Sequence, residues 1–141
     1  MMTTLTLKLL SAAPVFAPDF GIYSHRIGEQ WLVAENGRPL GEARRVRALS
    51  LPPQSSFCQV DDATQQLVVN EENVGWWAYP AHPEADVKRT PVAVFDMPKR
   101  EAGAMALVPG GLLALDPEAG ALHLYGRDGG TWRSHAYHQS I

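Results

Sequence analysis

The sequence predicts an all-β fold, namely a partial β-propeller of about three four-stranded antiparallel blades, which is half of a six-bladed ring. Runs of alternating polarity recur between turn-forming residues, and no helical stripe is longer than two turns. The 12 glycines and 11 prolines are spread at intervals, as many short strands with many turns require. A strand hairpin at residues 67–79 returns in weaker form at 112–125. A repeat of roughly 40 to 50 residues is typical of propeller blades.

Composition limits the class of protein. The 141 residues suit a single domain, and a hydrophobic fraction of 45% is enough for a core. The formal charge of −3 argues against nucleic acid as a partner, because phosphate contacts need a basic face. No stretch approaches the roughly 20 apolar residues that cross a bilayer, so no membrane is expected. The single cysteine, Cys58, excludes an internal disulfide and leaves the compartment open.

The first blade-sized unit is expected over residues 1–51. Leu5, Leu7 and Leu9 alternate with polar residues, which favours a strand over a signal peptide at the start of the chain. An Asn-Gly pair at 36–37 suits a hairpin turn, because both residues readily adopt positive φ angles. The strands expected in this unit cover residues 5–10, 19–25, 30–35 and 38–49.

Two further units follow the same plan over residues 52–97 and 98–141. In the second unit, proline and charge make 80–89 a surface loop between the last two strands. Glycine pairs at 110–111 and 129–130 mark the turns of the third unit. The expected strands cover 57–61, 66–70, 74–79 and 90–95 in the second unit, and 104–108, 112–115, 121–125 and 131–137 in the third.

Three blades do not close a ring. Propellers usually close with about four to eight blades, because an open array leaves sheet faces and edges bare. The chain is therefore expected to be a piece of a longer protein or to pair with a second copy. The partner expected from this count is a second copy or an adjoining propeller domain that closes the ring.

Acidic pairs stand on either side of the strand expected at 66–70. Asp61-Asp62 precede this strand and Glu71-Glu72 end it. Glu71-Glu72 suit a cation site or a solvated strand end, and Asp61-Asp62 suit a cation site or a turn stabilised by a side chain. The aromatic run that follows fits a core, since alternation places Trp76 on one sheet face and Trp77 with Tyr79 on the other.

Residues 14–141 resemble the β-propeller phytase family. The family pattern L-Y-V-x-E-E-D-V-G-I-W-K-Y-x-A-E-P runs beside residues 67–83 without a gap. The family's V-x-D-D stands beside Val60 to Asp62, its V-R beside Val46-Arg47, and the ending Y-x-R-x-G beside 125–129. A double acid, V-G, W and Y at fixed offsets seldom coincide by chance.

This resemblance implies a calcium-dependent phosphomonoesterase that acts on phytate and related inositol phosphates. Calcium takes six to eight oxygen ligands and neutralises a polyanionic substrate. The metal ligands carried over are Glu72, Glu71 and Asp61, the candidates for substrate contacts are Arg47 and Arg127, and no catalytic residue is assigned. The family suggests a secreted or periplasmic compartment, although the chain shows no clear signal peptide.

The chain departs from the family at several of the positions that matter. The glutamate of the family's P-E-G-C falls on Ser56, a phosphate-contacting lysine falls on Glu35, and the glutamate of E-G-L falls near Gly103 or Ala104. Each lost carboxylate removes charge and coordination, so calcium binding is expected to be weak or absent. Two functions remain open. One is a degenerate module with a structural, assembly or accessory ligand-binding role, and the other is a phytate phosphomonoesterase whose site a partner chain or missing domain completes.

Overall fold

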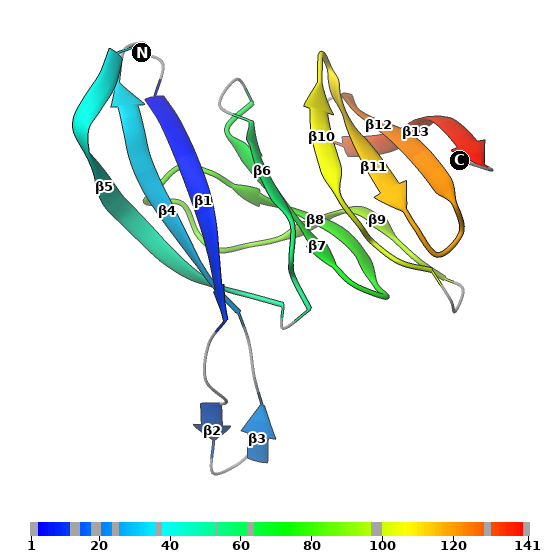
Figure 1. Cartoon of the computed structure of the whole chain (residues 1–141), viewed down its shortest axis with the longest axis horizontal. Coiled ribbons are helices and arrows are strands. Elements are labelled where there is room, and N and C mark those ends of the chain that lie inside the picture. The colour runs from blue at the N-terminus through cyan, green and yellow to red at the C-terminus, as the bar shows by residue number, and fades with distance from the viewer. Residues whose placement is uncertain are drawn as a thin grey trace.

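The computed structural model of the chain is all-β, and the described residues form strands without a helix (Figure 1). The structure describes residues 3–11, 15–17, 21–23, 26–35, 38–52, 54–61, 64–96, 100–128 and 131–139. The turns expected at 36–37 and 129–130, and Asp62, lie outside the described residues. The described part of the chain contains no helix that could cross a membrane.

The strands form four antiparallel sheets. The N-terminal sheet has the order β1(Thr3–Ser11), β4(Arg26–Glu35), β5(Arg38–Leu51). A separate hairpin is made by β2(Val15–Ala17) and β3(Gly21–Tyr23). The middle sheet has the order β6(Cys58–Asp61), β7(Gln66–Glu71), β8(Gly75–Pro80), β9(Thr90–Val94). The C-terminal sheet has the order β10(Met105–Val108), β11(Gly111–Asp116), β12(Ala121–Asp128), β13(Thr131–Gln139).

The second and third units are four-stranded as predicted, and the first unit differs. Of the strand expected at 19–25, the described residues 21–23 form β3, which pairs with β2 in a small hairpin beyond the end of the N-terminal sheet (Figure 1). The place beside β4 is occupied by β1, whose pairing runs from Thr3 opposite Glu35 to Ser11 opposite Arg26. The N-terminal sheet therefore has three strands and not the four expected, with the opening strand β1 at the edge beside β4.

The three large sheets stack with the middle sheet covered on both faces. Leu67 and Val69 of β7 pack against the N-terminal sheet, whereas Val68 between them packs against the C-terminal sheet. In β8, Trp76 faces the C-terminal sheet and Trp77 faces the N-terminal sheet, which confirms the predicted alternation. The edge strands β1, β6 and β10 lie side by side, as the first strands of neighbouring blades do (Figure 1).

The β7–β8 hairpin carries the predicted acidic pair on a tight turn. The amide of Val74 donates to the carbonyl of Glu71 over 2.9 Å. Asn73 has a φ of 69°, a left-handed conformation that asparagine tolerates better than most residues. Gly75 has a φ of 154°, and a Cβ there would lie 2.0 Å from the carbonyl oxygen of Ala93 in β9. The turn therefore needs glycine at 75, and it holds Glu71 and Glu72 at one end of the middle sheet.

Candidate functional site

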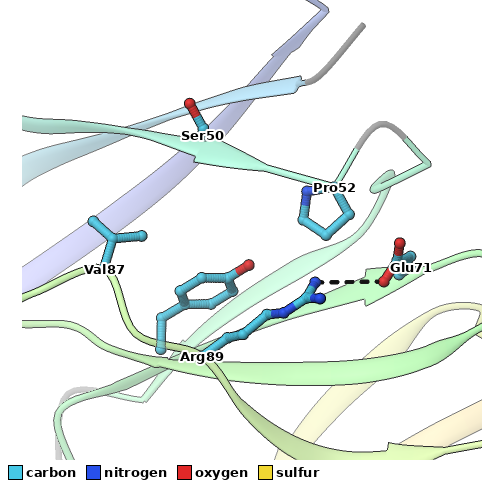
Figure 2. A pocket seen from close by; sticks show the side chains of 6 residues that line it. Ser50, Pro52, Glu71, Val87 and Arg89 are labelled. Carbon is cyan, nitrogen blue, oxygen red and sulfur yellow. Dashed lines mark ion pairs between the residues drawn. The ribbon is translucent and has the colours of Figure 1, made fainter. Parts of the chain in front are cut away.

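Glu71 lies in a small electrostatic cluster at the end of β7. The indole Nε1 of Trp77 donates to Glu71 Oε1 over 2.8 Å. Arg89 Nη1 lies 3.6 Å from the same oxygen, and the Arg89 guanidinium is 3.8 Å from the centre of the Trp77 ring. Figure 2 shows Arg89 pointing along the pocket to Glu71. The carboxylate is thus already compensated by a cation and a neutral donor from its own chain.

A pocket of about 440 Å³ opens beside this cluster, between the N-terminal and middle sheets (Figure 2). Burial raises the pKa of the Tyr79 phenol, and the nearby Arg89 offsets only part of that effect, so the phenol is protonated at neutral pH. The pocket therefore presents a phenol, a hydroxyl and a guanidinium that is shared with Glu71. Its lining residues are Ser50, Pro52, Glu71, Tyr79, Val87 and Arg89.

The third predicted metal ligand, Asp61, lies at the other end of the middle sheet. It pairs with Gln66 at the start of β7, whereas Glu71 ends that strand. At 3.3 Å per residue the separation along β7 is about 17 Å. Thr64 Oγ1 donates to Asp61 Oδ2 over 2.7 Å, so this carboxylate is part of the β6–β7 turn. The structure does not bring Asp61 to Glu71.

Glu72 stays close to Glu71 on the β7–β8 turn and is exposed. Its backbone amide donates to the carbonyl of Gln54 over 3.1 Å, which anchors the turn to the segment before β6. Its carboxylate has no hydrogen bond or ion pair in the described part of the chain. Of the three predicted ligands, the structure therefore groups Glu71 with Glu72, and only Glu72 has an unengaged carboxylate.

Asn70 forms hydrogen bonds to the two segments in which the phytase resemblance would place glutamates that this chain lacks. This side chain is 1% exposed, and its Oδ1 accepts from the amides of Ser56 and Phe57, each over 2.7 Å. Its Nδ2 donates to the carbonyl of Ala102 over 2.7 Å. A neutral amide therefore joins the segments before β6 and β10.

Glu35, the position of the expected phosphate contact, is not part of this end of the molecule. Ile27, near the start of β4, pairs with Ser50, which lines the pocket beside Glu71. Glu35 ends the same strand eight residues later, about 26 Å further along at 3.3 Å per residue. Glu35 therefore lies away from the pocket beside Glu71.

A second ion pair, with a fully buried carboxylate, lies at the same end of the C-terminal sheet, and no pattern in the sequence predicted it. Asp116 ends β11 with 0% exposure, and Arg100 Nε donates to its Oδ2. Asp116 Oδ1 accepts from the amides of Glu101, over 3.1 Å, and Ala119, over 3.0 Å. Arg100 Nη2 also lies 3.2 Å from His123 Nε2.

Electrostatics fix the charge states in this pair. Burial alone would raise the pKa of Asp116, but the hydrogen bonds from Arg100 and from two amides outweigh it and hold the pKa below its ordinary value. Burial lowers the pKa of His123, and the charge of Arg100 lowers it further. His123 is therefore neutral at pH 7 and accepts a hydrogen bond from Arg100.

The two arginines predicted to contact substrate lie away from Glu71. Arg47 donates to Gln30 Oε1 over 2.6 Å and to the carbonyls of Pro80, Ala85 and His82 over 2.8, 3.0 and 3.1 Å. These bonds fasten the loop after β8 to the N-terminal sheet. Arg127 lies near the end of β12, where it pairs with Trp132. The other end of this strand, at Ala121, lies opposite Asp116. The Nε atom of Arg127 is buried and has no hydrogen-bond partner among the described residues. Neither arginine lines the pocket.

Within the part of the chain that the structure describes, the acidic side chains do not form the calcium cluster that the resemblance implies. The described ranges hold no group of three or more His, Cys, Asp or Glu residues placed to share a metal ion. Calcium needs six to eight oxygen ligands. Glu71 is engaged by Arg89 and Trp77, and Asp61 lies at the opposite end of β7.

Comparison with known proteins agrees with the fold. A comparison with curated proteins finds no match. The family model named Phytase matches residues 23–136, which is most of the chain and includes β4 to β12 entire. The match covers the middle sheet with its acidic hairpin as well as the cores of both neighbouring sheets. The chain therefore belongs to the Phytase family.

Proposed function

We propose that this chain is a phytase-family propeller module that works without a calcium cluster of its own, in a structural, assembly or accessory ligand-binding role. The observation that carries the proposal is the internal neutralisation of Glu71 by Arg89 and Trp77. A cation that bound Glu71 would have to displace a guanidinium already close to it. In this site the negative charge of Glu71 is therefore balanced by an arginine of the same chain.

The second ion pair supports the same reading. Asp116 is fully buried and is compensated by Arg100 and by two backbone amides. Two acids at this end of the sheets therefore each have an arginine of their own, and no divalent cation is needed to relieve their charge. Glu72 offers at most two oxygens of the six to eight that calcium takes.

For an accessory role, the ligand class that suits the pocket is an inositol phosphate. Arg89 is the cation in the lining, and its side chain is 44% exposed, so an anion can reach it from solvent. Tyr79 and Ser50 add neutral hydrogen-bonding groups in the same pocket. A phosphate group would share Arg89 with Glu71, so binding by this module alone is expected to be weak.

A second candidate function is a calcium-dependent phosphomonoesterase acting on phytate, with the site completed by a partner chain or a missing domain. The observation that favours it is the exposed carboxylate of Glu72, which has no partner among the described residues. In that case Glu72 would be one ligand of a metal held mainly by the partner.

Calcium titration by calorimetry, together with phosphate release from phytate, separates the two functions in the full chain. The proposal predicts no binding in the micromolar range and no release of phosphate above background. Micromolar binding that is lost in Glu72→Gln, together with phosphate release, would establish the phosphomonoesterase. Arg44→Gln, an exposed change outside the pocket, is the matched control for the Glu72 variant.

A further inference from the structure

The C-terminal sheet carries a leucine face on the side turned away from the middle sheet. Leu113 lies directly opposite Leu124, and Leu115 lies opposite Leu122, on β11 and β12. Their strand neighbours Leu112 and Ala114 are 0% exposed and belong to the core against the middle sheet, so the four leucines point the other way. We call these four residues the leucine face.

In the described part of the chain, no element packs on the leucine face. The four side chains are only half-buried, by one another and by their own sheet. In the middle sheet, by contrast, both apolar faces are covered by neighbouring sheets. Figure 1 places the N-terminal sheet at one end of the row of sheets and the C-terminal sheet at the other.

The outer face of the N-terminal sheet is the matching open end. Gln30 and Leu32 of β4 point to the middle sheet, so Trp31 between them points outward. Its indole Nε1 is buried and has no hydrogen-bond partner. Trp31 lines a hollow of about 560 Å³ beneath the bulged segment 40–45 of β5. Tryptophan is among the residues that contribute most to protein–protein contacts, and the hollow beside Trp31 leaves room for a side chain of a partner.

We propose that the leucine face seats a second copy of this chain, through the outer face of that copy's N-terminal sheet. The contact continues the sheet-on-sheet packing that already joins the three sheets within one chain. Because each copy holds one face of each kind, two copies can cover both open ends reciprocally about a two-fold axis. The inference rests only on the stacked sheets of the proposed module, so the outcome of the calcium titration leaves it unaffected.

Light scattering coupled to gel filtration tests this proposal on the full chain. The expected mass is twice 15.4 kDa at about 0.1 mM protein. Leu113→Glu with Leu124→Glu should give a monomer, because two charges would be buried in an apolar contact. Leu113→Ala with Leu124→Ala preserves the fold better and should weaken dimerisation by at least about tenfold. Trp31→Ala should weaken it by a similar factor.

The control is Val94→Glu, an equally drastic change at a 50% exposed position on the edge strand β9. This variant should remain a dimer. A wild-type chain that stays monomeric at about 0.1 mM overturns the proposal. So does a dimer that survives the Leu113 and Leu124 changes. A dimer that these changes dissociate while Trp31→Ala does not would overturn the assigned partner face.

Discussion

Arg89 compensates Glu71 from the far end of the loop that follows β8. Its guanidinium lies over the Trp77 ring while it approaches the Glu71 carboxylate, so one side chain makes a cation–π contact and an ion pair. The sequence predicted the acidic pair and the face of Trp77. It did not predict Arg89, because charge and proline made 80–89 look like a surface excursion. Spacing along the chain does not show that the loop at 80–89 passes back to the end of β7, where Arg89 contacts Glu71.

Replacing Arg89 by methionine should leave the Glu71 carboxylate half-buried with Trp77 as its hydrogen-bond donor. We expect the free energy of unfolding to fall by about 1 kcal/mol, the sum of an exposed ion pair and an exposed cation–π contact. Urea denaturation followed by tryptophan fluorescence measures this change. Arg38→Met, at an exposed arginine that lies outside the pocket and outside the Trp31 hollow and has no side-chain partner among the described residues, should change stability by less than about 0.5 kcal/mol. Equal effects of the two variants would contradict the role of Arg89.

His123 gives the module an acid-sensitive contact. The folded-state pKa of His123 is lowered, so the unfolded chain binds more protons once the pH falls below the ordinary value of 6.5. The contribution of His123 to stability is therefore full above that pH and is lost progressively as the pH falls toward the folded-state pKa. Protonation would place a positive charge 3.2 Å from Arg100 Nη2.

Urea unfolding between about pH 7.5 and 5.5 measures this effect. His123→Phe keeps an aromatic ring stacked on Tyr125, whose ring centre is 5.6 Å away, and should flatten the pH dependence relative to wild type. His138→Gln, an exposed change on β13, should leave the wild-type slope in place. Identical slopes in wild type and His123→Phe would show that His123 is not the sensitive group.

For the middle and C-terminal sheets, the alternation of apolar and polar residues together with the turn residues was sufficient to predict the strands. The strands there begin and end within a few residues of the predicted limits, because each hairpin has an apolar alternation and a turn residue of its own. The first unit was predicted less well. Alternation with a period of two residues shows which side chains of a strand share a face, but it does not show which strand pairs with it. The pairing of β1 with the edge of β4 could therefore not be predicted from the sequence.

The β7–β8 hairpin depends on Gly75. A Cβ at this position would lie 2.0 Å from the carbonyl oxygen of Ala93, and the φ of 154° disfavours other residues. Gly75→Ala should therefore destabilise the chain by more than about 2 kcal/mol, since β9 would have to move. Gly41→Ala is the matched control, because a Cβ there meets no atom within 4 Å. A thermal melt that ranks the two variants equally would rule out this account of the hairpin.

At the scale of the molecule, the stacked sheets form two cores on either side of the middle sheet. The sequence predicted this stacking through Trp76 and Trp77. It also suggested a metal site from Asp61, Glu71 and Glu72, but Asp61 ends β6 beside the start of β7, whereas Glu71 and Glu72 lie together at the other end of β7. Closeness along the chain was therefore a poor guide to the site. The arginines that compensate Glu71 and Asp116 come from other segments.

If arginines of this member of the Phytase family take the place of calcium, as we propose, then adding the metal should leave the stability of the chain unchanged. Thermal unfolding of the full chain in EDTA and in about 1 mM calcium tests it most directly. We expect melting temperatures within about 1 °C of each other, because without a calcium site the metal adds no binding free energy to the folded state. A micromolar site would add about 4 kcal/mol at that concentration and raise the melting temperature by roughly 10 °C. A rise of that size would show that the chain binds calcium at a site of its own and would rule out the proposed replacement of the metal by arginines.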